Sequence, residues 1–224
     1  MKLLSNLALA AACLTALTPV AASAQAVQSW DVYNDFNGPQ WVYGQRAGPG
    51  CAGASAKLLY PYGPNAPAGT GFIGWQGVNT PTIVPLVAKN PGNSQVVYSS
   101  AQLPANSVWL HPGETRVNPV CAAVRFKAPM AGKYRIKGFI KSIDVGANQV
   151  NGYIFVNNTL VGSPIALSGP MGTQANFDQV VTLVGMPRNI DFALDDGGSY
   201  YNDSTQLALT ITRCPTGNGG PNVC

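Results

Sequence analysis

Hydrophobic and polar residues alternate in short segments along the second half of the chain. The clearest segment runs from Lys133 to Ile143, where every second side chain is apolar or small and most of the others are cationic. Successive side chains of a β-strand point to opposite faces, so this spacing predicts a strand with one buried face and one polar face. The residues predicted to face the core are Tyr134, Ile136, Gly138 and Ile140.

Other segments of strand-like composition are separated by Pro, Gly and Asn. They are 40–45, 56–60, 71–76, 82–88, 95–99, 120–128, 152–156, 159–162, 177–184, 189–194 and 206–213. Asn157 and Asn158 tolerate the positive φ of a tight hairpin turn. No segment after residue 24 sustains a helical period. The pattern predicts an all-β fold, a two-sheet antiparallel β-sandwich of the jelly-roll type.

Composition agrees with this fold. Hydrophobic residues make up 46% of the chain and the formal net charge is only +4, which argues against disorder. Charged residues make up 10%, and 25 Gly and 18 Pro supply turn formers for many short strands. The small positive charge does not call for a nucleic-acid partner.

The first 24 residues have the pattern of a signal peptide. Lys2 precedes an apolar run, and Ala22-Ser23-Ala24 fits a cleavage site of small residues. The run is too short to span a bilayer, so we expect no transmembrane segment and a secreted or periplasmic product. The predicted organisation is a leader at 1–24, one sandwich domain at 25–213, and a terminal loop at 214–224. Lipidation at Cys13 is an alternative that we disfavour, because the branched residue of a lipobox is missing.

Four cysteines lie outside the predicted leader, and an even number in an exported chain indicates disulfides. Four cysteines allow three pairings. The nine residues between Cys214 and Cys224 form a flexible loop that could close locally, which favours this pair and leaves Cys51 with Cys121. Free buried cysteines are the alternative. A cysteine metal site is disfavoured, because the chain has no CxxC and one histidine.

Several motifs resemble a group of exported bacterial proteins, many of which carry a C-terminal envelope-sorting tail. The motifs are WLHPG at 109–113, RFKAPMAGKYRIKG at 125–138, VNNTLV at 156–161 and SYYNDSTQLALTI at 199–211. The resemblance spans about residues 35–212 and implies a jelly-roll sandwich akin to galactose-binding and other carbohydrate-binding modules. Most members of the group have no established activity. This chain departs from the group, since no apolar anchor follows Thr212 and cysteines end the chain instead.

The acidic segment from Asp195 to Asp203 is the first candidate site. Carboxylate, amide and carbonyl oxygens are the ligands that calcium prefers, and the resemblance adds that jelly-roll sugar-binding modules often hold a structural calcium. The predicted calcium ligands are Asp195, Asp196, Asn202 and Asp203. The alternative is a polar turn joining the last two strands.

Aromatic side chains near Gly- and Pro-rich loops are the second candidate site, because sugar rings pack their C–H faces on aromatic rings. The predicted ligand-binding residues are Tyr60, Tyr62, Tyr200, Tyr201 and Asn202. Core packing is the favoured interpretation for each of these aromatics, as it is for Trp41, Tyr43 and Trp75, and the four tyrosines are the best candidates for exposure because they border polar loops.

The polar face of the strand at 133–141 is the third candidate. Its cations form a basic stripe of Lys133, Arg135, Lys137 and Lys141. Such a stripe attracts polyanions such as acidic polysaccharide, and the alternative is a solvated sheet face.

Catalytic signals are sparse. His111 and Glu114 are the only histidine and the only glutamate, no GxSxG motif is present, and we expect His111 to be structural. The sequence therefore predicts a secreted, non-catalytic module that binds polysaccharide or envelope glycan. A structural or adhesive matrix protein is the alternative, and a glycan-active enzyme using Asp195, Asp196 or Asp203 is a weaker one.

Overall fold

A computed structural model describes residues 27–58, 60–61, 69–77, 84–113, 120–146, 148–199, 201–215 and 224. The described chain is all β apart from one 3-10 turn at Pro49–Cys51, which confirms the predicted fold class. The strands are β1 (Ser29–Asp31), β2 (Trp41–Ala47), β3 (Ser55–Lys57), β4 (Tyr60–Pro61), β5 (Ile73–Gln76), β6 (Leu86–Asn90), β7 (Val96–Tyr98), β8 (Ala101–Leu103), β9 (Ser107–His111), β10 (Val120–Lys127), β11 (Gly132–Ser142), β12 (Asn148–Val156), β13 (Thr159–Gly169), β14 (Gln174–Leu183), β15 (Asn189–Leu194) and β16 (Thr205–Arg213).

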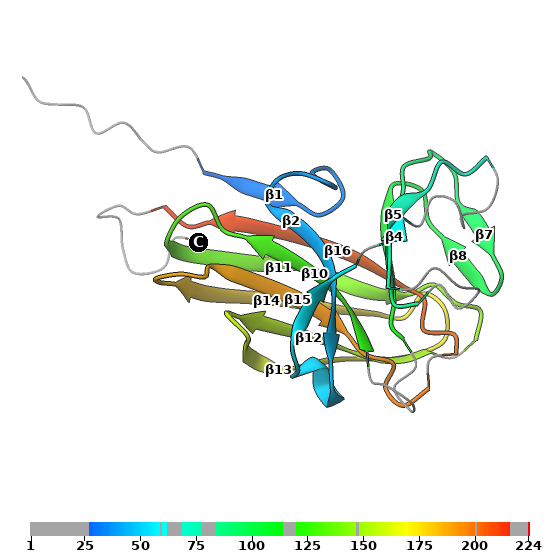
Figure 1. Ribbon diagram of the computed structural model, residues 1–224. Coiled ribbons are helices and arrows are strands. Elements are labelled where there is room, and N and C mark those ends of the chain that lie inside the picture. The colour runs from blue at the N-terminus through cyan, green and yellow to red at the C-terminus, as the bar shows by residue number, and fades with distance from the viewer. Residues whose placement is uncertain are drawn as a thin grey trace, which may run out of the picture.

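Two antiparallel sheets pack face to face (Figure 1). The larger sheet has the order β14-β11-β16-β9-β6-β5-β4, and β1 pairs with β16. The smaller sheet has the order β13-β12-β15-β10-β2-β3. From β10 to β16 the chain passes repeatedly between the two sheets, as in a jelly roll, and the hairpin of β7 and β8 forms a separate small sheet at one end.

The main core fills the space between the sheets. It contains Tyr134, Ile136 and Ile140 of β11, each at most 1% exposed. The period-2 pattern of this strand thus predicted the buried face correctly, and the cationic face is the one in water. A second apolar cluster lies under the β7–β8 hairpin, around Trp109 and Leu103.

The hairpin between β12 and β13 turns at Asn157 and Asn158, with φ of 50° and 71°, as predicted. The local sequence pattern predicted a single strand over residues 56–60, which the structure does not show. Ser55–Lys57 pairs with β2 in the smaller sheet, whereas Tyr60–Pro61 pairs with β5 in the larger one. The prediction of one strand there was wrong, because local composition does not report a change of sheet.

Two disulfides are present, Cys51–Cys121 and Cys214–Cys224, with Cα–Cα distances of 5.7 and 4.7 Å. They are the pairing that the sequence favoured. Disulfides persist in oxidising compartments, so they fit an extracellular or periplasmic protein. Over the residues that the structure describes, no helix is both long and apolar enough to cross a bilayer.

Candidate functional site

The acids of the loop that follows β15 point into the protein. Asp195, Asp196 and Asp203 are 9%, 1% and 1% exposed. The Asp195 carboxylate accepts hydrogen bonds from the backbone N–H and side-chain amide of Asn151, from the Tyr153 hydroxyl at 2.8 Å, and from the Gly197 N–H. These donors anchor the loop to β12, so Asp195 has a structural role here.

Asp203 is as fully buried as Asp196 and Asp144. Its Oδ2 has no hydrogen-bond partner among the described residues. Burial, with the negative charges of Asp196 and Asp144, raises the pKa of Asp203 to about 9. Asp144 accepts hydrogen bonds from the Ser100 hydroxyl and the Ser204 N–H, at 2.7 and 2.5 Å. The buried carboxyls therefore hold loops together at one end of the sandwich.

The residues predicted to bind calcium do not form a ready-made ligand shell. Four donors already occupy the oxygens of Asp195, and one oxygen of Asp196 accepts the Gly198 N–H. Within the described ranges, no three His, Cys, Asp or Glu side chains are grouped so that they could hold a metal ion. A calcium site at Asp195, Asp196, Asn202 and Asp203 stays a prediction, and nothing below depends on it.

The predicted aromatic loop site is described only in part. The Tyr201 side chain is 66% exposed, and Asn202 beside it is half-buried with a φ of 63°. Tyr60 lies in β4, where only its backbone is described, and Tyr62 and Tyr200 lie outside the described residues. Of the four predicted tyrosines, Tyr201 is therefore the one whose side chain lies among the described residues, and it is exposed.

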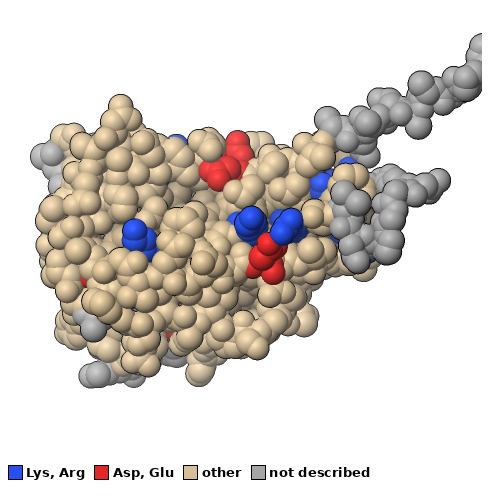
Figure 2. Space-filling model, turned by 180° about the vertical axis from the view of Figure 1, so that it is seen from behind, with Lys and Arg blue, Asp and Glu red and all other residues tan. Residues whose placement is uncertain are grey.

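The basic stripe lies on the outer face of the larger sheet. Lys133 and Lys137 are exposed, but Arg135 pairs with Asp178 on β14 through two contacts of 2.7 and 2.5 Å. This guanidinium lowers the pKa of Asp178. The Asp178 carboxylate in turn offsets much of the positive charge of Arg135. Figure 2 shows the molecule from behind, with cationic groups next to acidic ones on a mostly neutral surface. The stripe is thus a weaker anion attractor than four free cations.

Two shallow grooves flank Lys137 on this outer face. One, of about 390 Å³, runs along β11 and β14 and includes Phe139, Asn176 and Asp178. The other, of about 420 Å³, has Ala208, Thr210 and Thr212 of β16 as its floor. The two threonine hydroxyls are hydrogen-bonded to Asp31 and Ser29, which leaves the floor flat and weakly polar.

A different surface, centred on Trp75, brings aromatic and polar side chains together. Trp75 of β5 is half-buried, and its indole N–H donates to the Asn37 side-chain oxygen at 3.2 Å. The Lys57 ammonium, on the edge strand of the other sheet, lies 5.6 Å from the Trp75 ring centroid. The Lys89 ammonium lies 4.0 Å from the centroid of Tyr33 and donates to the Tyr33 carbonyl. We call Trp75, Tyr33, Asn37, Lys57 and Lys89 the Trp75 site.

The loop between β1 and β2 holds Tyr33 and Asn37 in place. The Asp31 carboxylate accepts the N–H groups of Tyr33 and Asn34, which makes a tight local turn. Asn37 has a φ of 67°, in the left-handed region that asparagine tolerates better than most residues. Its N–H donates to the Tyr43 hydroxyl, and the Tyr43 ring stacks on Phe36 with a centroid distance of 4.3 Å. Burial raises the pKa of Tyr43 well above its usual range, so this phenol stays neutral.

Sequence reasoning favoured core packing for Trp75, and the half-buried rings of Trp75 and Tyr33 do pack against the main core. It did not single out Tyr33, Asn37, Lys57 or Lys89 as binding residues. With Trp75, these residues come from three strands, β3, β5 and β6 of both sheets, and from one loop, and no local spacing connects them. One signal was available in Asn37-Gly38-Pro39, a turn sequence directly before β2.

His111 agrees with its predicted structural role. Its Nδ1 lies 2.7 Å from the Pro112 carbonyl oxygen, at the end of β9. Burial of the ring lowers the pKa of His111, which favours the neutral form.

No protein-family model matches this chain, and no curated protein matches it either. Among solved structures, the chain is similar to a family 35 carbohydrate-binding module from Clostridium thermocellum, with a TM-score of 0.29, 14% identity, and coverage of 53% of this chain and 97% of that one. A CBM35 from Paenibacillus barcinonensis gives a TM-score of 0.27 and 19% identity over 53% of this chain and 88% of that one. An isomalto-dextranase from Arthrobacter globiformis T6, complexed with panose, gives a TM-score of 0.28 and 13% identity, with coverage of 84% of this chain and 32% of the enzyme. TM-scores this low assign no ligand and no reaction, so function is argued from the site itself.

Proposed function

We propose that the protein is a non-catalytic glycan-binding module and that the Trp75 site is where it binds sugar. The observation that carries this proposal is the half-exposed Trp75 ring, held by Asn37 and bordered by Lys57. An aromatic face offers an apolar platform for the C–H face of a pyranose ring.

The polar groups of the site suit hydroxyl recognition. The Asn37 oxygen is used by the Trp75 indole, so its amide NH₂ is left to donate to a sugar oxygen. Lys57 adds an ammonium group over the Trp75 ring, and Lys89 adds one over the Tyr33 ring. Because both are cationic, carboxylated glycans belong among the ligands to be tested, beside neutral ones.

The position of the acids supports the non-catalytic part of the proposal. Glycoside hydrolysis needs two carboxyl groups that face each other across the bound sugar. Asp195, Asp196 and Asp203 are buried, and none of them lines either groove on the outer sheet face. Asp31 and Asp35 lie in the loop that carries Tyr33 and Asn37, where both carboxylates accept backbone N–H groups.

Binding is tested on a panel of neutral and acidic polysaccharides by affinity electrophoresis, with and without chelator. Asn37→Gly keeps the positive φ and removes the amide, and Trp75→Ala removes the platform. We expect each to weaken binding about tenfold or more, the size expected for losing an aromatic contact or a hydrogen bond. Tyr201→Ala is the matched control, since it removes an exposed aromatic from the other candidate loop.

Each outcome has a separate meaning. Loss of binding in Tyr201→Ala but not in Asn37→Gly would move the sugar site to the loop after β15. Binding to no glycan, with the variants folded, would reject glycan recognition.

A structural or adhesive role is the second candidate, and β13 is the observation that favours it. This edge strand is 11 residues long, is largely exposed and carries no charged side chain. Long uncharged edges are templates for pairing with another chain, although Pro164 in this strand removes one N–H donor. If β13 mediates adhesion, the chain self-associates with rising concentration in light scattering, and Ser163→Lys reduces this. If the chain stays monomeric at all concentrations, the exposed edge of β13 no longer supports an adhesive role.

A further inference from the structure

Two loops that connect the sheets lie side by side at the end of the sandwich that holds Cys214 and Cys224. One is the turn 128–131 between β10 and β11, and the other is the connection 184–188 between β14 and β15. Gly132 pairs with Leu183, Lys127 pairs with Asn189, and the Ala128 N–H donates to the Arg188 carbonyl. In Figure 1 this end lies opposite the β4, β5, β7 and β8 extension. We call these two loops the loop end.

The tips of the loop end are apolar and exposed. Met186 and Val184 are 79% and 71% exposed, the highest values among the large hydrophobic side chains of the described residues. Met130 on the neighbouring turn is exposed as well. Isolated exposed hydrophobics are common on protein surfaces, but here three of them share two adjacent loops.

Cations surround these tips. They are Lys127, Lys133, Arg188 and Arg213, and the segments 127–133 and 184–188 contain no acid. Burial raises the pKa of the Tyr134 phenol, and the charges of Arg213 and Arg188 oppose this rise. The phenol donates to the Met130 carbonyl, so both arginines lie close to the turn. Within the described part of the chain, none of the four cations forms an ion pair.

The loops are held firmly in place. The Arg188 guanidinium donates to the Pro129 carbonyl, and the Asn157 N–H donates to the Asn189 carbonyl. The Cys214 N–H donates to the Lys133 carbonyl, so the last strand is fixed to the same end. The exposed side chains are therefore presented on a fixed frame.

From this juxtaposition we propose that the loop end docks on an anionic lipid surface, with Met130, Val184 and Met186 entering the headgroup region and the four cations facing the lipid phosphates. Peripheral membrane binding has two main contributions. Apolar side chains are buried in the membrane interface, and cations at headgroup level are attracted to anionic lipids. Two short loops offer far less area than a stable protein interface requires, which disfavours a protein partner.

The proposal is tested by flotation of the purified chain with vesicles of phosphatidylglycerol and phosphatidylcholine, compared with phosphatidylcholine alone. We expect binding to the anionic vesicles that falls as salt is added. The double variant Val184→Ser, Met186→Ser should weaken it about tenfold or more. Lys127→Ala and Lys133→Ala should each weaken it about fivefold.

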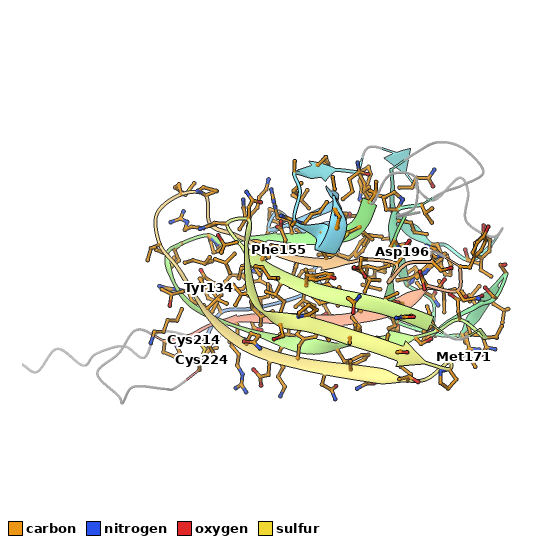
Figure 3. All side chains as sticks on the ribbon, turned by 90° about the horizontal axis from the view of Figure 1, so that it is seen from below. Tyr134, Phe155, Met171, Asp196, Cys214 and Cys224 are labelled. Carbon is orange, nitrogen blue, oxygen red and sulfur yellow. A yellow bond between two sulfur atoms is a disulfide. The ribbon has the colours of Figure 1, made fainter. Side chains whose placement is uncertain are left out.

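Matched controls come from elsewhere on the molecule. Met171 is 42% exposed at the opposite end from Cys214, as Figure 3 shows, and Met171→Ser should leave vesicle binding unchanged. Lys141→Ala is the matched charge control, at the far end of β11. Unimpaired binding of the Val184→Ser, Met186→Ser variant, or no binding to anionic vesicles, overturns the proposal. Glycan binding by that variant should equal wild type, which separates this result from the proposed sugar site.

Discussion

Arg46 and Asp191 form an ion pair with an N–O distance of 2.7 Å, and their side chains are 1% and 2% exposed, respectively. They lie on the outer face of the smaller sheet, where a sandwich normally meets water. Arg125 makes two further contacts with the same carboxylate. The Arg46 guanidinium carbon lies 4.0 Å from the Phe155 ring centroid, and its Nε–H donates to the Cys51 carbonyl. The turn that carries the Cys51–Cys121 disulfide thus covers this part of the outer face.

Asp191→Asn is expected to destabilise the fold by about 3–5 kcal/mol, because it leaves two guanidinium groups, one of them fully buried, without their counter-charge. Urea unfolding measures the change. Asp178→Asn is the matched control, since the Arg135–Asp178 pair is 38% and 41% exposed and solvent screening leaves it a much smaller contribution. Equal losses in the two variants would contradict the structural role assigned to Arg46 and Asp191.

Replacing Cys51 and Cys121 together by Ala should cost about 2–4 kcal/mol. The bond links residues 70 apart and removes more chain entropy from the unfolded state than Cys214–Cys224, which links residues 10 apart. The Cys214→Ala, Cys224→Ala variant should therefore lose less, as measured by denaturant midpoints at one pH. The reverse order would show that the terminal loop contributes more than its length indicates.

Asp203 should make stability depend on pH in an unusual direction. Its pKa is about 9 in the folded chain against 3.8 in the unfolded chain, so the folded state holds a proton that the unfolded state releases. The stabilisation that comes from holding this proton in the folded state is fully present below pH 3.8. It is lost as the pH rises toward 9, and the free energy of unfolding falls by up to about 1.4 kcal/mol per pH unit. Asp203→Asn keeps the neutral form at every pH. It should therefore be more stable than wild type at pH 8 and lose this difference near pH 4, in parallel urea titrations. A constant difference across that range would refute the assignment.

The predicted calcium site in the Asp195–Asp203 loop should raise the melting temperature by several degrees in excess calcium chloride relative to EDTA, because a ligand that binds only the folded state stabilises it. Protein donors already occupy Asp195, so binding requires the loop to rearrange. Differential scanning fluorimetry provides the measurement, and Asp203→Asn should abolish the rise. An unchanged melting temperature would reject the site.

Much of the scaffold could be predicted from the chain alone. The alternation at Lys133–Ile143 predicted a strand and its buried face, because alternating apolar and polar side chains fit a β-strand that packs one face on a core. The two asparagines of the β12–β13 hairpin and the local pairing of Cys214 with Cys224 were likewise recognised from short-range chemistry. The three-residue strands β1 and β8 were missed, since so short a segment carries no measurable period.

The candidate sites were a harder problem for sequence reasoning. The Asp195–Asp203 segment has the composition of a solvated, ligand-holding loop, yet its acids are buried against β12 and beside Asp144. Whether a polar turn faces water depends on what packs over it, and the residues that do so here come from distant parts of the chain.

The sequence by itself determined the fold class and the buried face of β11, since both depend on patterns of neighbouring residues in the chain, and it favoured the observed disulfide partners among three pairings. Only the tertiary structure decided which polar groups are buried and which aromatic rings meet amide and ammonium groups. Asn37 lies on a loop, Lys57 on the edge strand of the smaller sheet and Trp75 on the strand next to the edge of the larger sheet. The packing of those sheets, rather than any spacing along the chain, makes them one site.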